Sequence, residues 1–310
     1  MKSPLVPVVV TFLWVAAPGV IADSAVLAPV ADTTLFESTA NNNLGASSLA
    51  VGATGHALAA RALLRFDVSG IPSNATVTSA TLRFVVSRAP LNEGLPSLFE
   101  LHRFLSPWTE GTGVDNLGST AQPGETTWLS QFHGSALWSQ PGSAVDVDYS
   151  STISSSVPIN PLPEGETAPY TFESTAELIA DVQAWVSQTT TNHGWIMISS
   201  DEQTATTARR IFSREDAASP PLLEVQYSLP PADPVPQFTS AATANAAFEM
   251  RFTVPSTYCY EVQYRESLVN TNWSALTNVC APVSDVQAIA TDSLAGPQRF
   301  YRLRISDRIR

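Results

Sequence analysis

Three tryptophans are the aromatic residues best placed to contact a flat ligand. Trp108, Trp128 and Trp138 lie in or beside Gly- and Thr-rich stretches that have the composition of loops. An indole presents an apolar face that packs against the C–H groups of a pyranose ring. We therefore predict these three residues as ligand contacts, with capping of the hydrophobic core as the alternative for Trp108 and Trp128.

Arg209, Arg210 and Arg214 form the densest group of cations in a chain that is otherwise acidic. A guanidinium holds a carboxylate through two parallel hydrogen bonds, which suits it to the acidic group of a uronate sugar. We predict that Arg209 and Arg210 bind ligand. For Arg214, a structural ion pair with Glu215 or Asp216 is favoured instead.

Hard oxygen donors occur together at Asp32, at Glu37 and in the Asn-rich loop 41–43. Carboxylate and amide oxygens are the ligands that calcium prefers. The grouping matches no specific calcium-binding motif. A structural calcium ion held by Asp32 and Glu37 is therefore one expectation, and we expect no cofactor to be required.

Catalytic motifs are absent from the sequence. It contains no His-Glu-x-x-His, no Gly-x-Ser-x-Gly and no Gly-rich phosphate loop, and its four histidines are scattered. No pair of carboxylates is marked out as acid and base, although residues distant in sequence can form a site in space. We predict a protein that is not an enzyme.

The overall charge restricts the class of partner. The chain has 28 acidic and 16 basic residues, a formal net charge of −12, and only 14% of its residues are charged. This excess of negative charge disfavours nucleic acid and an anionic membrane surface as partners. A polyanionic ligand would need an isolated face of cations, or calcium as a bridge.

Residues 1–22 have the pattern of a secretory signal peptide. Lys2 begins a short positive region, an apolar stretch runs from 5 to 15, and a Pro-Gly pair precedes a cleavage site after Ala22. The apolar stretch is shorter than the ~20 residues that span a bilayer. We predict a secreted protein, extracellular or at the cell surface, with no membrane insertion.

Period-two alternation of apolar and polar residues dominates the chain after the leader. It is clearest at 62–66, 82–86 and 223–227, and turn residues separate these stretches. This pattern is typical of antiparallel strands with one face on a core. Many short strands with regular turns predict an all-β fold, a jelly-roll β-sandwich.

One stretch departs from the alternation. Leu178, Val182 and Trp185 have helical spacing, and Ser174 with Glu177 forms a capping box before them. We expect one short helix over the end of the sandwich, with Trp185 as a core anchor.

A proline-rich segment at 229–237 predicts a linker between two domains, 23–228 and 238–310. Short alternating stretches in the second domain predict a small C-terminal β-sandwich. Cys259 and Cys280 are the only cysteines of the chain, and in an exported protein such a pair is predicted to form a disulfide.

Seven short stretches of the first domain follow one another in a recognisable order. They are Asp-Thr-Thr-Leu at 32–35, Arg-Ala-Leu-Leu-Arg-Phe-Asp at 61–67, Ala-Thr-Leu at 80–82, Trp-Thr-Glu-Gly at 108–111, Thr-Thr-Trp at 126–128, Val-Gln-Ala-Trp-Val at 182–186 and Phe-Ser-Arg-Glu at 212–215. Together they resemble the DNRLRE-domain family, bacterial carbohydrate-binding modules of the alginate-binding kind. The resemblance implies a jelly roll, a non-catalytic polysaccharide-binding role and attachment to secreted multidomain proteins.

The tail resembles a second kind of module. Tyr-Glu-Val-Gln-Tyr at 260–264, Asn-Trp at 272–273 and Arg-Phe-Tyr-Arg-Leu-Arg at 299–304 are similar to a small fibronectin-type-III-like module. Such modules are common at the ends of exported bacterial proteins.

Three functional hypotheses follow. The first is a secreted, non-catalytic protein that binds a polysaccharide, in particular an acidic glycan such as alginate. The second is a structural or adhesive protein of the cell surface or matrix. The third, a polysaccharide-degrading enzyme with a site assembled in space, is disfavoured because no catalytic motif is present.

Overall fold

The computed structural model describes residues 21–90, 96–230, 233–234, 236–244, 247–267, 269, 272–293 and 299–309. It divides into two compact units, Met1–Pro231 and Ala232–Arg310, called here the first and second units. The predicted signal peptide lies outside the described residues except for its last two positions. None of the helices in the described part of the chain is long and apolar enough to cross a bilayer.

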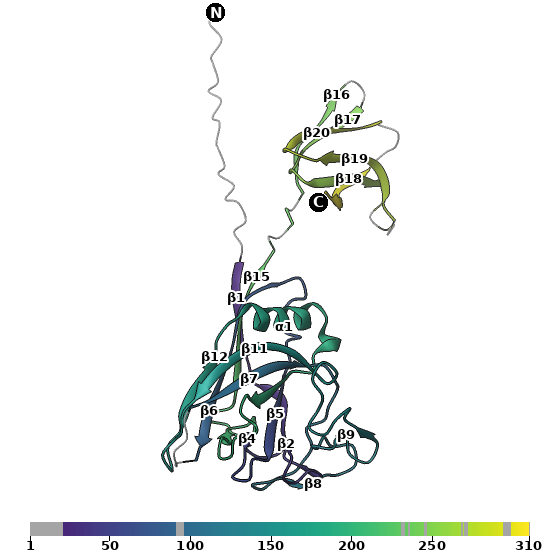
Figure 1. Ribbon diagram of the computed structural model, residues 1–310. Coiled ribbons are helices and arrows are strands. Elements are labelled where there is room, and N and C mark those ends of the chain that lie inside the picture. The colour runs from purple at the N-terminus through teal and green to yellow at the C-terminus, as the bar shows by residue number, and fades with distance from the viewer. Residues whose placement is uncertain are drawn as a thin grey trace, which may run out of the picture. The chain divides into compact units, whose positions relative to one another are not determined.

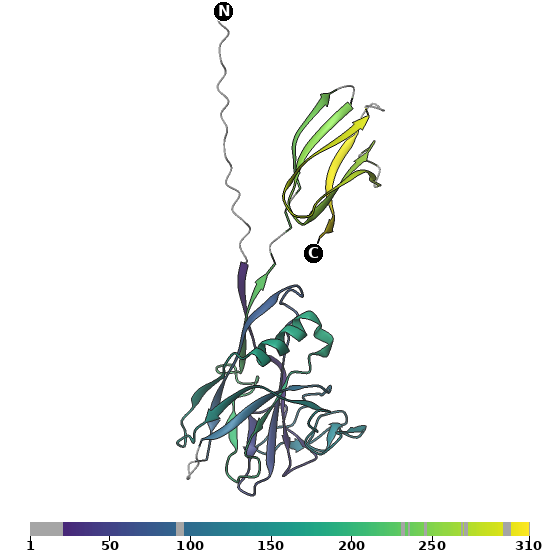
Figure 2. The same cartoon turned by 45° about the horizontal axis from the view of Figure 1, so that its top comes forward.

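The first unit is an all-β sandwich with one α-helix, as the alternation predicted (Figures 1 and 2). Its strands are β1 (Ile21–Leu27), β2 (Pro29–Phe36), β3 (Asn42–Asn43), β4 (Leu49–Ala53), β5 (Ala59–Phe66), β6 (Thr76–Arg88), β7 (Ser97–Phe104), β8 (Ser119–Thr120), β9 (Ser130–Phe132), β10 (Ala136–Leu137), β11 (Tyr149–Ile159), β12 (Ala168–Phe172), β13 (Trp195–Ser199), β14 (Arg209–Ile211) and β15 (Leu222–Leu229).

Most of these strands belong to one continuous antiparallel sheet that curls over itself. Its order is β1-β15-β6-β14-β4-β5-β13-β7-β11, with β12 also paired to β6 and β2 to β5. Strand β4 pairs with both β14 and β5, so it joins the two halves of the sheet. The two halves form the two layers of the sandwich.

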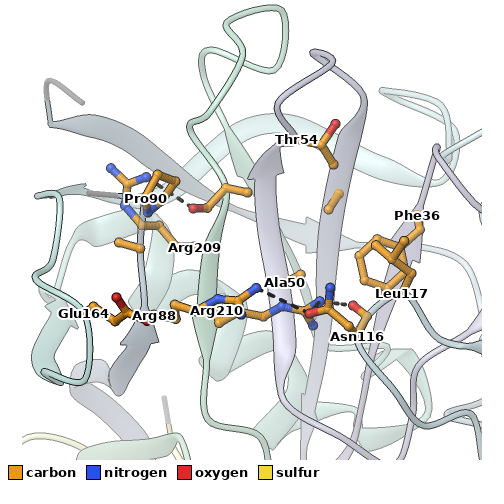
Figure 3. Close-up of a pocket in the computed structure, with 13 residues that line it drawn as sticks. Phe36, Ala50, Thr54, Arg88, Pro90, Asn116, Leu117, Glu164, Arg209 and Arg210 are labelled. Atoms are coloured by element: carbon orange, nitrogen blue, oxygen red, sulfur yellow. Dashed lines mark hydrogen bonds between the residues drawn. The ribbon is translucent and has the colours of Figure 1, made fainter. Parts of the chain in front are cut away.

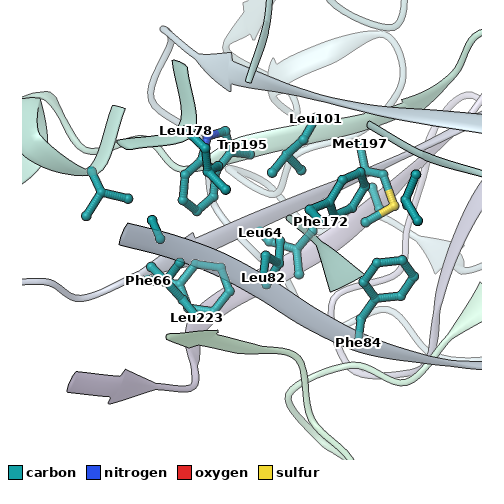
Figure 4. Close-up of a cluster of buried hydrophobic side chains, with 14 of the residues drawn as sticks. Leu64, Phe66, Leu82, Phe84, Leu101, Phe172, Leu178, Trp195, Met197 and Leu223 are labelled. Atoms are coloured by element: carbon teal, nitrogen blue, oxygen red, sulfur yellow. The ribbon is translucent and has the colours of Figure 1, made fainter. Parts of the chain in front are cut away.

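The main core fills the space between the layers. Leu64 of β5 and Trp195 of β13 come from one layer, and Leu82 of β6 and Leu223 of β15 come from the other (Figure 4). All four side chains are buried, together with Leu178 of the helix. The inward positions of the alternating stretches are therefore those that the sequence predicted.

The helix α1 (Ala176–Ser187) packs against β6 in one layer and β11 in the other, so it closes one end of the sandwich. Trp185 on α1 is fully buried, and its ring packs edge to face against that of Trp195 with 4.4 Å between the ring centroids. This packing confirms its predicted role as a core anchor. The predicted cap was wrong by one residue. The cap is Thr175, whose hydroxyl accepts a hydrogen bond from the backbone N–H of Leu178. The Ser174 hydroxyl instead accepts a hydrogen bond from the backbone of β6.

A second buried cluster lies on the other face of β5, β13 and β7. Leu63 and Ile196, whose neighbours in the strands face the main core, pack here against tryptophans from the long segment that follows β7. These strands are therefore apolar on both faces, and β13 is buried at every position. The segment between β7 and β11 acts as a third layer over the sheet.

The second unit is a small β-sandwich of two three-stranded antiparallel sheets. One sheet has the order β16-β17-β20 and the other β19-β18-β21; the strands are β16 (Phe238–Ala244), β17 (Ala247–Val254), β18 (Tyr258–Arg265), β19 (Ser274–Ala281), β20 (Val286–Ser293) and β21 (Phe300–Arg308). Cys259 and Cys280 lie directly opposite each other on β18 and β19 and are joined by a disulfide, which confirms that prediction.

Candidate ligand-binding site

A surface depression of about 440 Å³ opens on the outer face of the layer that contains β4, β14 and β6. Its lining includes Phe36, Arg88, Asn116, Leu117 and Arg210 (Figure 3). We call it the arginine depression. It combines two cations, a side-chain amide and apolar side chains at one concave surface, the combination that binding sites for small ligands use.

An irregularity in β6 brings the two cations together. Arg210 on β14 pairs with Arg88 on β6, but the next residue, Ile211, pairs with Val86. Ser87 is therefore an extra residue on β6, and a β-bulge of this kind turns the side chains that follow it toward the other face. Arg88 consequently joins Arg210 outside the core, although strict alternation from Val86 would place Arg88 inside.

The guanidinium of Arg210 is partly held by the protein. It donates to the backbone oxygen of Ser48 at 3.2 Å, to the side-chain oxygen of Asn116 at 2.8 Å and to the backbone oxygen of Asn116. It also lies over the ring of Phe36, 5.7 Å from the centroid. Burial, and then the positive charge of Arg88, lower the pKa of Arg210 to about 10, so the side chain stays cationic at neutral pH.

No carboxylate among the described residues neutralises the two arginines. Glu164 lines the same depression, yet no carboxylate oxygen among the described residues lies within 4.0 Å of the charged nitrogens of Arg88 or Arg210. Arg88 is exposed, and its guanidinium donates a 3.4 Å hydrogen bond to the side-chain oxygen of Asn116. The depression therefore favours an anionic group as its occupant.

Arg209 takes a different role from Arg210. Consecutive strand residues point to opposite faces, and the side chain of Arg209 is only 1% exposed. It donates to the backbone oxygens of Thr207, Ala208 and Ile159 at 2.8, 3.3 and 3.2 Å. Arg209 therefore contributes to the lining of the depression as a buried side chain, whereas Arg88, which the sequence analysis missed, is the exposed cation that accompanies Arg210.

The three tryptophans that were predicted to bind ligand are all buried in the second cluster. The guanidiniums of Arg61 and Arg65 lie over Trp128 and Trp108, at 5.3 and 5.2 Å from the ring centroids. Trp138 is 5% exposed and donates its indole N–H to a backbone oxygen at 2.8 Å. This burial favours core capping, the alternative role for Trp108 and Trp128, and extends it to Trp138.

The residues predicted for calcium do not lie in one cluster. A carboxylate oxygen of Glu37 accepts a hydrogen bond from the backbone N–H of Ala59 at 2.7 Å. Asp32 instead lies with Glu110 and Glu215, and one oxygen of each of these three carboxylates is within 4.8 Å of the others. Burial, as the largest cause, raises the pKa of Asp32 to about 8.

Arg214 lies beside this carboxylate cluster. Its guanidinium donates two hydrogen bonds to Glu110, at 2.5 and 2.9 Å, and lies 3.3 Å from Glu215. The predicted ion pair with Glu215 is therefore present. Glu110 is an additional partner that sequence spacing did not indicate, because it is more than a hundred residues away along the chain.

Comparison with known proteins gives one family. Residues 23–112 match the model of carbohydrate-binding module family 96. The search of curated proteins gave no match to the chain. The matched stretch contains Phe36 and Arg88 of the arginine depression, and it supports a carbohydrate-binding module in the first unit.

Proposed function

We propose that the protein is a secreted, non-catalytic module that binds an acidic polysaccharide of the alginate type at the arginine depression. The observation that carries the proposal is the pairing of Arg88 with Arg210, with no neutralising carboxylate in the part of the chain that the structure describes. Between positions 23 and 231 the sequence has twenty-one acidic residues and only eight arginines. In so acidic a surrounding, two adjacent cations without an acidic partner favour the binding of anions.

The depression offers different contacts to the parts of a uronate residue. Arg88 is exposed and free to turn its planar guanidinium toward a carboxylate, to which it can donate two hydrogen bonds. Asn116 supplies an amide for hydroxyl groups, and Leu117, which is 39% exposed, supplies an apolar edge. Trp138 takes no part in this binding site, because its indole is buried.

The affinity should be modest and should depend on salt. An exposed ion pair contributes only about 0.2–1 kcal/mol, so one depression gives weak binding to each sugar unit. The Debye length falls from about 10 Å at 0.1 M salt to about 3 Å at 1 M, which weakens attraction between separated charges. Repetition of the uronate along a polymer compensates for weak single contacts by raising the local concentration of sites.

The test is calorimetric titration of the full chain with alginate, laminarin and xylan, supported by affinity electrophoresis. Arg88→Ala should weaken binding to alginate about two- to fivefold, because an exposed ion pair contributes up to about 1 kcal/mol. Arg210→Lys keeps the charge but removes the planar fork, so it should also weaken binding. Arg83→Ala is the matched control, since Arg83 lies on the same strand and is already paired with Glu224 at 2.6 Å.

Two outcomes would contradict the proposal. Equal binding of alginate by wild-type protein and Arg88→Ala would exclude the arginine depression as the site. No heat and no gel retardation with any of the three glycans would favour the structural or adhesive hypothesis.

Export is part of the same proposal. It is supported by the charge and hydropathy pattern of residues 1–22 and by the disulfide, because disulfides persist in oxidising compartments. N-terminal sequencing of the exported protein should begin at Asp23. A protein that remains inside the cell with its leader attached would contradict this part of the proposal.

A further inference from the structure

Three carboxylates from three separate segments converge at one place in the first unit. Asp32 lies on β2, Glu110 in the segment after β7, and Glu215 in the segment after β14. One oxygen from each lies within 4.8 Å of the other two. Like charges at this separation repel one another unless a cation lies between them.

The hydrogen bonds of Asp32 leave one of its oxygens without a partner. The residue is fully buried, and its Oδ2 accepts a hydrogen bond from the backbone N–H of Arg214 at 2.8 Å. Its Oδ1 is also buried and has no hydrogen-bond partner among the residues that the structure describes. An unpaired carboxylate oxygen in the interior is costly, and it is normally satisfied by a donor, a water molecule or a cation.

Arg214 neutralises only part of the cluster. Its guanidinium is bound to Glu110 and lies beside Glu215, so one positive charge faces three carboxylates. The pKa of Asp32, about 8, keeps the excess at one negative charge while Asp32 is protonated, and the excess becomes two when Asp32 is ionised. A divalent cation balances this excess.

We propose that Asp32, Glu110 and Glu215 together bind a divalent cation, and that the cation is calcium. Calcium lies 2.3–2.6 Å from its oxygen ligands, so two ligands on opposite sides of it are about 5 Å apart. The three oxygens lie within 4.8 Å of one another, so all three fall within the reach of one calcium ion. Magnesium requires near-ideal octahedral geometry at about 2.0–2.1 Å and gives up its water reluctantly, so carboxylates from three separate segments suit the more adaptable calcium ion better.

The surrounding structure holds the ligands in place. Glu110 Oε1 accepts a hydrogen bond from the backbone N–H of Asp32 at 2.8 Å, which links the two segments that carry these ligands. The side-chain amide of the buried Asn43 donates a hydrogen bond to the backbone oxygen of Glu110. Its oxygen accepts a hydrogen bond from the backbone N–H of Gly113 at 3.0 Å. The segment that carries Glu110 is therefore fixed before any ion binds, and such preorganisation favours binding.

The experiment is calorimetric titration of the full chain, stripped with EDTA, with calcium chloride and with magnesium chloride, in the absence of polysaccharide. Wild-type protein should bind one calcium ion and should melt at a higher temperature in its presence. Glu215→Gln should weaken calcium binding about tenfold or more, because calcium affinity depends on the number of charged ligands.

Glu173→Gln is the matched control, since Glu173 is an exposed carboxylate of the same unit outside the cluster. Circular dichroism without calcium should show the same fold for both variants, because the side chain of Glu215 is at the surface. No heat and no melting shift with calcium would show that Arg214 alone balances the cluster and would overturn the proposal. Unchanged calcium binding by Glu215→Gln would overturn it as well. Neither result bears on glycan binding at Arg88, which is measured separately.

Discussion

At the scale of single residues, burial assigns Trp138 to the stability of the fold. Its indole N–H bond to the backbone of Thr127 and its edge-to-face contact with Phe104 hold it within the second cluster. Trp138→Ala should lower the free energy of unfolding by about 3–5 kcal/mol, as expected for a large buried aromatic residue. Urea unfolding of the variant tests this. A loss of glycan binding with unchanged stability would restore Trp138 as a ligand contact.

Tyr301 in the second unit gives a prediction for alkaline pH. Its hydroxyl donates to Asp292 at 2.7 Å, and burial, together with this hydrogen bond, raises the pKa of Tyr301 to about 12. A phenol pKa that is raised in the folded state stabilises the fold below pH 10, the ordinary value, and this stability is lost as pH rises from 10 to 12.

The measurement compares melting of wild-type protein and Tyr301→Phe at pH 9 and pH 11. The wild-type second unit should lose more stability between the two pH values than the variant does, since phenylalanine has no proton to lose. Equal losses in the two proteins would show that Tyr301 does not contribute to the alkaline transition.

Residue types alone predicted only part of the candidate site. Arg210 was found because a cation in an acidic chain is conspicuous in sequence. Arg88 was not, since its outward position depends on the extra residue Ser87, and such a β-bulge is recognised from the pairing of the strands. The burial of the tryptophans was not predictable because a segment with the composition of a loop can still be buried, and here the guanidiniums of Arg61 and Arg65 cover Trp128 and Trp108.

At the scale of secondary-structure elements, the disulfide joins two neighbouring strands of the second unit. Cys259 and Cys280 are opposite each other on β18 and β19 and are 21 residues apart in sequence. Replacing both by serine should lower the stability of the second unit by about 2–4 kcal/mol, mainly by freeing the unfolded chain. The first unit should melt unchanged. Calorimetry of the full chain resolves the two transitions, and a shift of both would contradict the independence of the units.

The elements themselves were largely predictable. Alternating stretches became β5, β6 and β15, and the one stretch of helical spacing became α1. Their pairing was not predictable, because the sheet places β14 between β6 and β4, which are distant in sequence. The cap of α1 was misplaced because Ser174 and Thr175 are both good capping residues, and only the backbone geometry distinguishes them.

At the scale of the whole molecule, the boundary between the two compact units falls within the proline-rich segment 229–237, which the sequence predicted as a linker. Exposed segments between domains are the preferred sites of limited proteolysis. A protease should therefore cut there first and release a stable fragment close to 23–228. Mass spectrometry identifies the fragment, and circular dichroism tests its fold. First cleavage within the sandwich of either unit would contradict this division.

Strands β1 and β15 are antiparallel neighbours, with Asp23 opposite Tyr227 and Leu27 opposite Leu223. The chain therefore enters and leaves the first unit at the same end, only one strand spacing apart. Such a unit can be transplanted as a cassette, because it fits into a surface loop of a host protein without separating the host residues on either side. The same closeness lets a short peptide join the two ends, so that circularly permuted versions keep the arginine depression intact.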